Sequence, residues 1–179
     1  YSISDITGLQ DMHNLHILNA NNNNISDLSP LNFLSNLQYL RLNENNLSNI
    51  DLSSINSLYD VQLDDNQISQ IILPDSAFNN GNLYLRNNIL QSIVFPNDCG
   101  IRTLLMQNNP LDSLDVSSLI NLYDLRLENT NISSLDLSNN QLLYRLFLFQ
   151  NNSLNFLDLS NKDNLHYFQI RNNSTLNEL

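Results

Sequence analysis

Cysteine is nearly absent from this chain of 179 residues, which contains Cys99 alone. A single cysteine excludes a disulfide within the chain, and a fold without bridges suits the cytosol and equally a secreted bacterial protein. Proline and glycine are also scarce, with four and three residues. Their scarcity excludes a collagen-like chain and a flexible linker.

Positive charge and long apolar runs are lacking as well. Lysine and arginine together number 7 against 18 acidic residues, which gives a net charge of −11. This balance argues against binding to nucleic acid or to an anionic membrane, because both need clustered basic residues. No run of about 18 apolar residues occurs, so no segment is predicted to enter a membrane. The chain starts at Tyr1 in mid-repeat without a recognisable signal peptide, so we expect a fragment of a longer protein.

Leucine and asparagine, in contrast, recur with a fixed spacing. Residues 37–50, LQYLRLNENNLSNI, place apolar side chains at Leu37, Leu40, Leu42, Leu47 and Ile50, with Asn45 between them. The same frame returns every 21 or 22 residues. Because such a period is the signature of a solenoid, we predict one repeat domain over residues 1–179. It comprises a partial repeat over residues 1–14 and eight repeats that begin at residues 15, 37, 58, 80, 101, 122, 143 and 165.

Each repeat contains the pattern L-x-L, which has the period of a β-strand with alternate side chains facing inward. Successive repeats place these strands side by side, which predicts a parallel sheet on one face of the solenoid. The residues expected to face inward are Leu40 and Leu42, Val61 and Leu63, Leu83 and Leu85, Leu104 and Met106, Leu125 and Leu127, Leu146 and Leu148, and Phe168 and Ile170.

A column of asparagines follows the strands. Its members are Asn23, Asn45, Asn66, Asn88, Asn109, then Thr130, either Asn151 or Asn152, and Asn173. An amide side chain carries donors and acceptors, so at this bend it can satisfy backbone groups that neither helix nor sheet serves. We therefore predict a structural ladder for this column.

The opposite side of each repeat carries a different motif. Later repeats contain Asp51-Leu-Ser53, Asp115-Val-Ser117, Asp136-Leu-Ser138 and Asp158-Leu-Ser160. We expect the middle residue to pack inward, and the Asp and Ser to hydrogen-bond the local turn. A calcium site is the alternative for these aspartates. They are single acids in successive repeats without the dense oxygen cluster that calcium needs, so no metal is predicted.

The repeat pattern is irregular in two places. Residues 72–79 lack the usual spacing, and Asn80 replaces the first leucine of its repeat. The last two repeats carry one extra residue, which displaces Leu154 and Leu176.

The whole chain resembles bacterial leucine-rich repeat proteins. The segment ISDLSPLNFLSNLQYLRLNENNLSNI is similar to the repeats of the internalins, and LDVSSLINLYDLRLENTNISSLDLSNNQL is similar to the shorter repeats of internalin-like surface proteins. The resemblance implies a curved leucine-rich repeat solenoid of the α/β repeat class, with the parallel sheet on its concave face. Extended, turn or short 3-10 segments are then expected on the convex face, and protein recognition on the concave one.

The residues that face outward from the predicted strands differ in kind from the rest of the chain. All six arginines and six of the seven tyrosines fall there, with Tyr1 the exception, together with six of the 18 acids. The remaining 12 acids are balanced by Lys162 alone. Tyrosine and arginine are enriched at the energetically important positions of protein interfaces, which predicts a recognition surface. The predicted contact residues are Tyr39, Arg41, Tyr59, Tyr84, Arg86, Tyr123, Arg126, Tyr144, Arg145, Phe147, Phe149, Tyr167 and Arg171.

This surface is densest in the last three repeats, around Phe147 and Phe149. Strands in a sheet lie about 4.8 Å apart, so the aromatic and arginine side chains there should be contiguous. The alternative is that the arginines serve their neighbours. Ion pairs are then expected between Asp64 and Arg86 and between Asp124 and Arg145, with Arg126 in a cation–π contact with Phe147. We expect these side chains to serve both as a recognition surface and in contacts with their neighbours.

No catalytic constellation is visible in the sequence. His13 and His16 have no carboxylate or cysteine at metal-ligand spacing, and Cys99 lies far from His166 in the repeat order. No phosphate-binding loop occurs. We therefore expect neither enzyme activity nor a cofactor.

The main hypothesis is a non-catalytic module that binds a protein of a host or a neighbouring cell, as part of an adhesin-like bacterial surface or secreted protein. The alternative is the targeting arm of a larger effector enzyme whose catalytic domain lies outside these residues, located in the cytosol, including that of a host cell after delivery. A purely structural spacer is the third possibility. The oligomeric state is left open.

Overall fold

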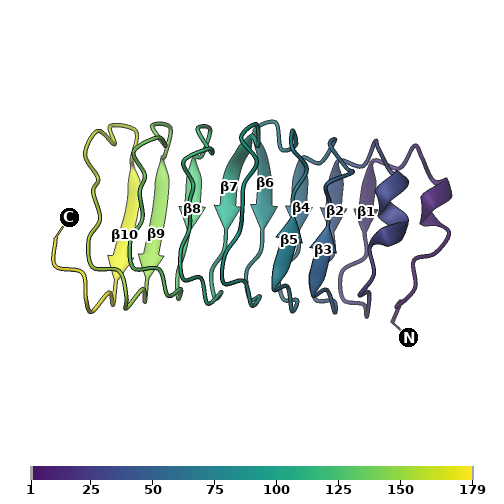
Figure 1. Ribbon diagram of the computed structural model, residues 1–179, viewed down its shortest axis with the longest axis horizontal. Helices are drawn as coiled ribbons and strands as arrows, with labels where there is room; N and C mark the ends of the chain where they lie inside the picture. Colours follow the sequence, from purple (N-terminus) through teal and green to yellow (C-terminus); the bar gives the residue numbers. More distant parts are fainter. Residues whose placement is uncertain (1, 179) are drawn as a thin grey trace.

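The computed structural model describes residues 2–178 as an elongated solenoid, with the two ends of the chain at opposite ends of the long axis (Figure 1). Tyr1 lies outside the described residues. One parallel sheet of eight strands runs along one side of the molecule, which confirms the predicted architecture. Its strands, in spatial order, are β1 (Ile17–Asn19), β2 (Tyr39–Arg41), β4 (Asp60–Gln62), β6 (Gly81–Tyr84), β7 (Ile101–Leu105), β8 (Asp124–Arg126), β9 (Arg145–Phe149) and β10 (Tyr167–Arg171).

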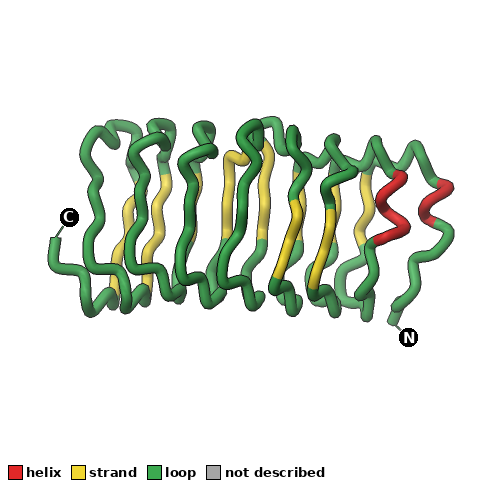
Figure 2. Tube along the Cα trace, in the orientation of Figure 1, coloured by secondary structure: helices red, strands yellow, loops and turns green. Residues whose placement is uncertain are grey.

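The opposite side of the solenoid is made mostly of turns and extended segments (Figure 2). Two short strands, β3 (Asn49–Asp51) and β5 (Gln70–Ile72), pair in parallel there. Two 3-10 helices, η1 (Leu9–Asp11) and η2 (Ser29–Phe33), lie near the N-terminal end. The prediction of extended segments and short 3-10 turns on this side is therefore confirmed.

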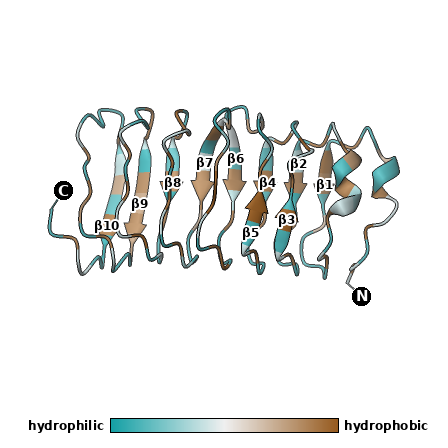
Figure 3. Ribbon diagram, viewed as in Figure 1, coloured by the Kyte–Doolittle hydropathy of each residue, from teal (hydrophilic) through white to brown (hydrophobic). Residues whose placement is uncertain are grey.

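The core lies between the two sides and follows from the L-x-L pattern. In β9, for example, Leu146 and Leu148 face inward with no exposed surface, while the residues between them face outward. Each inward residue lies beside its counterpart in the next strand, as Leu40 does beside Val61. Burying one such side chain contributes about 1.5–3 kcal/mol. The outward positions are more polar along most strands, as Tyr39 and Arg41 of β2 or Asp60 and Gln62 of β4 are, and Figure 3 shows hydrophilic and hydrophobic residues within the strands of the sheet.

The two inward residues of β10 differ from the rest of the core. Phe168 and Ile170 pack against the core but are only partly buried. They belong to the last strand of the sheet, which has a neighbour on one side only.

The asparagine column hydrogen-bonds the backbone at the bend. Asn66 is typical: its Oδ1 accepts a hydrogen bond from the N–H of Leu47 at 3.1 Å. Its Nδ2 lies within 3.0–3.1 Å of the carbonyl oxygens of Leu42, Leu63 and Asp64. Asn45, Asn88 and Asn109 repeat this arrangement one coil apart. Each amide therefore joins its own coil to the one before it.

The bonding changes where Thr130 replaces asparagine. Asn151, and not the exposed Asn152, takes the position in the following repeat. Its Oδ1 accepts hydrogen bonds from the Thr130 N–H at 3.0 Å and the Thr130 hydroxyl at 2.6 Å. Asn173 in turn accepts from the Asn151 N–H at 2.9 Å. Within the described residues, however, Thr130 makes no side-chain hydrogen bond to the preceding coil, and the buried Nδ2 of Asn151 has no partner, so the ladder is interrupted at this point.

A second column at the bend was not expected from the sequence. The residue before each ladder position has a left-handed backbone, a conformation in which Asn and Asp are enriched. These residues are Asn22, Glu44, Asp65, Asn87, Asn108, Asn129, Gln150 and Asn172, with φ between 54° and 58°. The N–H of each except Asn172, which is in the last coil, donates to a carbonyl of the next coil, as Asn87 does to Gln107 at 2.9 Å. The recurring Asn-Asn pairs were the sequence signal for this turn.

The irregular repeat is accommodated by Phe78 and two glycines. Phe78 is fully buried, whereas Asn80, which stands where other repeats have leucine, is exposed. A Cβ on Gly81 would lie 2.0 Å from the Tyr59 carbonyl oxygen, and one on Gly100 would lie 2.7 Å from that of Phe78. Both distances exclude a side chain. The register of β6 against β7 shifts at Gly81.

Replacing Asn66 with alanine tests the ladder. The change leaves the Leu47 N–H and several carbonyls without partners in a buried site, and each such group costs about 1–3 kcal/mol. We expect the free energy of unfolding to fall by about 3 kcal/mol in urea titrations. Asn46→Ala, at an exposed neighbouring asparagine, serves as control and should change it by less than about 0.5 kcal/mol. Equal effects of the two changes would contradict the role given to the ladder.

Candidate protein-binding face

The side of the eight-stranded sheet that points away from the core is here called the sheet face. Its side chains form columns across the sheet, because residues at the same position in successive strands are register partners. One such column contains Asp124, Arg145 and Tyr167, and the next contains Arg126, Phe147 and Gln169. The spacing of the strands therefore decides which side chains touch.

The last three strands carry a cluster that we call the C-terminal patch. It consists of Tyr123, Arg126, Tyr144, Arg145, Phe147, Phe149, Tyr167 and Arg171. The rings of Tyr123 and Tyr144 are stacked, with centroids 4.8 Å apart and planes 9° from parallel. Tyr144 also meets the edge of Tyr167 at 5.5 Å, and Phe147 meets Phe149 at 6.2 Å. The structure thus brings these predicted residues into one contiguous surface.

Arginines cover the rings of this patch. The guanidinium carbon of Arg126 lies 4.7 Å from the ring centre of Phe147, the cation–π contact that the sequence suggested. Arg145 lies 5.3 Å from the ring of Tyr167, and Arg171 lies 5.1 Å from that of Phe149. Such contacts contribute about 0.5–1 kcal/mol at exposed sites and hold both groups in a fixed arrangement.

Two residues outside the predicted contact set extend the patch. Arg102 lies 4.2 Å from the ring centre of Tyr123, and the His166 ring stacks on Tyr144 at 4.6 Å. Together with the two tyrosines they form a continuous stack across four repeats. Both occupy the second position of their repeats, Arg102 within β7 and His166 directly before β10, and this shared position was the signal that could have placed them in the set.

Part of the arginine content neutralises aspartates within the sheet face. Arg86 donates to Asp64 from Nε at 3.0 Å and from NH2 at 2.6 Å, and the Asp64 side chain is buried. This predicted pair is present, and the bond raises the pKa of the Arg86 guanidinium. The predicted ion pair between Asp124 and Arg145 is also present, at 3.6 Å, but the main partner of Asp124 is Arg126 on the same strand, with two bonds of 3.0 Å.

The other predicted contact residues lie apart from the C-terminal patch, on β2, β6 and neighbouring segments. Tyr39 and Tyr59 meet edge to face at 5.8 Å. Tyr84 is half-buried, and burial followed by the charge of Asp60 raises the pKa of its hydroxyl. Leu105 stands at an outward position of β7, beside Arg126, but is only 7 % exposed, so it belongs to the buried support of the sheet face.

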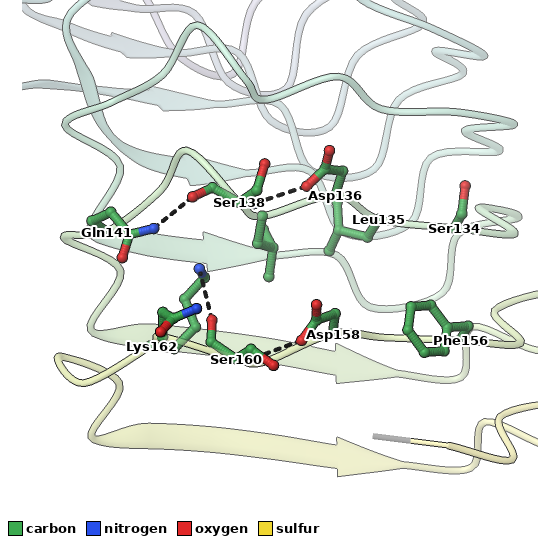
Figure 4. Close-up of a pocket in the computed structure, with 11 residues that line it drawn as sticks. Ser134, Leu135, Asp136, Ser138, Gln141, Phe156, Asp158, Ser160 and Lys162 are labelled. Carbon is green, nitrogen blue, oxygen red and sulfur yellow. Dashed lines mark hydrogen bonds between the residues drawn. The ribbon is translucent and has the colours of Figure 1, made fainter.

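The aspartates of the opposite side are occupied in their own turns. Figure 4 shows Asp136 and Asp158 beside a pocket of about 350 Å³, each bonded to the serine two residues on. Asp136 accepts from the Ser138 N–H at 2.8 Å, and Asp158 accepts from the Ser160 N–H at 2.7 Å. The same bond occurs at Asp51 and Asp115. Within residues 2–178, no three His, Cys, Asp or Glu side chains gather into a metal-binding group.

These bonds make the stability of the domain sensitive to acid. Hydrogen bonds from Ser53, Ser117, Ser138 and Ser160 lower the pKa of Asp51, Asp115, Asp136 and Asp158 below 3.8. A carboxyl whose pKa is lower in the folded state stabilises the fold above its unfolded pKa and loses that effect as the pH falls through the folded value. We expect the free energy of unfolding to fall below about pH 4.

The triple change Asp115→Asn, Asp136→Asn and Asp158→Asn should make this fall shallower, because an amide oxygen still accepts the bond but does not titrate. Urea titrations between pH 6 and pH 2 measure the slope. An unchanged slope in the triple variant would contradict this account.

The groups weighed for catalysis are engaged elsewhere. Nδ1 of His16 donates to the Asn14 carbonyl at 2.7 Å, and Nδ1 of His166 donates to the Asn164 carbonyl at 2.8 Å. Cys99 is buried, and burial raises the pKa of its thiol to about 11. A protonated, buried thiol is a poor nucleophile.

Cys99 should accordingly be unreactive in the folded domain. We expect Ellman's reagent at pH 8 to modify it at less than about a hundredth of the rate seen in 6 M guanidinium chloride, because reaction needs an exposed thiolate. Absorbance at 412 nm follows the reaction. Rapid modification of the folded domain would show that the site around Cys99 is open.

Comparisons with known proteins identify solved structures with a similar fold. No protein-family model matches the sequence, and no curated protein matches it either. Among solved structures, the chain is similar to the leucine-rich repeat domain of APL1B, with a TM-score of 0.66 and 23 % identity over 78 % of this chain and 44 % of that one. It is also similar to the internalin InlF from Listeria monocytogenes, with a TM-score of 0.50 and 20 % identity over 95 % of this chain and 64 % of that one.

The functional domain of InlJ from Listeria monocytogenes matches with a TM-score of 0.40 and 20 % identity. The chain spans less than two thirds of the length of either protein named before it. At these identities the likeness establishes the leucine-rich repeat fold, as the repeat pattern predicted. No helix in residues 2–178 is long and apolar enough to cross a membrane.

Proposed function

We propose that this leucine-rich repeat domain binds a partner protein through its sheet face, with the C-terminal patch as the principal contact surface. The observation that carries the proposal is the continuous layer of aromatic rings and guanidinium groups over β8, β9 and β10. Tyrosine and arginine side chains of this kind supply most of the binding energy in protein interfaces.

The contacts within the patch support binding in a second way. Stacked rings and ring-covered arginines are already held in one arrangement, so less side-chain freedom is lost when a partner docks. Tyr167 is 51 % exposed, and Phe147 and Phe149 are half-buried, so their rings still present surface to a partner. A purely structural use of these side chains does not require that exposure.

The charge distribution supports the same surface. The sheet face holds six arginines and six acids, whereas the rest of the chain holds 12 acids and Lys162. A strongly acidic back and edge keep the molecule soluble and discourage association there. The nearly neutral sheet face lacks that repulsion.

We further propose that the domain belongs to an adhesin-like bacterial protein that acts at the cell surface or after secretion, on a protein of a host or neighbouring cell. The structural likeness to an internalin supports this setting. Its test is the location of the full-length protein in the source cell, by surface labelling and fractionation.

Phe147→Ala and Tyr167→Ala test the sheet face as the binding surface. The partner captured by the wild-type domain is purified, and its Kd is measured for each variant by calorimetry. We expect each change to raise Kd by about thirtyfold or more, because truncating a central aromatic residue costs about 2 kcal/mol. Melting temperatures check that the fold survives.

Val94→Ala is the matched control, because Val94 is 82 % exposed and lies on the opposite side of the solenoid. It should leave Kd unchanged. Arg126→Ala is unsuitable for this purpose, since it would leave the buried carboxylate of Asp124 without its main partner. Loss of binding in the control and not in the aromatic variants would place the interface elsewhere.

A further inference from the structure

Glu128 is a sheet-face carboxylate without a counter-charge. The other acids of that face have partners or full exposure: Asp64 and Asp124 bond to arginines, Asp60 and Asp65 bond to amides, and Glu44 is exposed. Glu128, in contrast, is half-buried. Within the described residues its Oε2 is shielded from water and accepts no hydrogen bond.

The nearest arginine in the sequence is committed to other groups. Arg126 donates two hydrogen bonds to Asp124 and lies over the ring of Phe147. No ion pair between Arg126 and Glu128 forms in residues 2–178. Burial raises the pKa of the Glu128 carboxyl, and a hydrogen bond with the residue's own backbone and then the charge of Arg126 oppose that effect only in part.

A second acceptor without a donor stands beside Glu128. Gln107 occupies the matching position of the preceding repeat, since the carbonyls of both residues accept hydrogen bonds from the left-handed residue one coil earlier. Neighbouring strands of a sheet are about 4.8 Å apart. Oε1 of Gln107 is also shielded and, in the described part of the chain, has no partner. Phe149, half-buried, holds the matching position on the other side.

We infer that Glu128 and Gln107 receive an arginine side chain of the partner protein, an inference that rests on the proposed function. The site offers two acceptors without donors, one of them a carboxylate, which calls for a cationic donor, whereas the neighbouring Phe149 ring is already covered by Arg171 of this chain. A guanidinium carries five donors in a planar fork, so a single group can bond to acceptors on adjacent strands, whereas an ammonium is a point charge.

The shielding of one carboxylate oxygen favours this use. Oε2 of Glu128 is shielded and has no partner in the described residues, so the carboxylate has unused capacity to accept a hydrogen bond. Rotation of the flexible Gln107 side chain brings its amide oxygen to the same donor. A partly desolvated carboxylate also attracts a cation more strongly than an exposed one does.

Peptide selection tests the inference without knowledge of the natural partner. A phage-displayed library of random dodecapeptides is selected in parallel on the wild-type domain, on Glu128→Gln and on Asp112→Asn. The control removes the same single charge at an exposed position outside the sheet face. We expect arginine to be enriched at one position in the wild-type and Asp112→Asn pools, and to lose that enrichment in the Glu128→Gln pool.

A double-mutant cycle then measures the contact. The best wild-type peptide is synthesised with its arginine, with lysine and with the neutral analogue citrulline, and Kd is measured against both proteins. We expect arginine and Glu128 to be coupled by about tenfold or more in Kd, with lysine intermediate. Gln107→Met, which removes the second acceptor, should also weaken the same peptide, and its effect should be coupled to that of Glu128→Gln because one guanidinium bonds both acceptors.

The possible failures are distinguishable. Peptides that lose affinity with Phe147→Ala but show equal arginine enrichment in all pools, or additive effects in the cycle, would overturn the inference and leave the proposed function standing. Peptides that bind without any effect of the sheet-face changes would overturn both.

Discussion

Each coil of this solenoid must satisfy the backbone groups at the bend that follows its strand, where neither helix nor sheet supplies partners. The ladder amides meet this constraint, and their reach between coils ties one repeat to the next. Asn88, for example, accepts from the Ile68 N–H of the preceding coil and donates to carbonyls of both coils. The left-handed residue beside each ladder position turns the chain so that this amide points inward. Leucine packing and strand register both depend on that spacing.

The side chains at the seventh position of each repeat, on the sheet face, change from a structural role to a solvent-facing one along the chain. In the first repeats this column is structural, because the side chains of Asn21, Asn43 and Asp64 each accept from the backbone N–H of the next repeat. From Arg86 onward the column holds Gln107, Glu128, Phe149 and Arg171, for which no such bond to the backbone exists in the described residues. Of the side chains without this structural role, Phe149 and Arg171 belong to the C-terminal patch, and Gln107 and Glu128 form the pair of acceptors without donors.

The sequence was sufficient for the parts that depend on periodicity. A two-residue alternation inside a 21- or 22-residue period fixes strand direction, register and inward face, and so the neighbours Phe147 and Arg126 could be named in advance. The sequence was insufficient for contacts that depend on side-chain conformation or on burial. Asp124 bonds along its own strand to Arg126 more closely than across to Arg145, and Leu105 is buried. The choice between Asn151 and Asn152 likewise depended on how the extra residue was absorbed.

Strand β9 combines inward Leu146 and Leu148 with outward Phe147 and Phe149, so it is apolar on both faces. A strand of this kind is an aggregation hazard when its outer face is bare. Here guanidinium groups from the strands on either side lie over the two phenylalanine rings. Water therefore meets weakly hydrated cations in place of bare rings, which reduces that hazard. Under the proposed function a partner would lose little in displacing that water, so the arrangement that protects the patch is also compatible with binding.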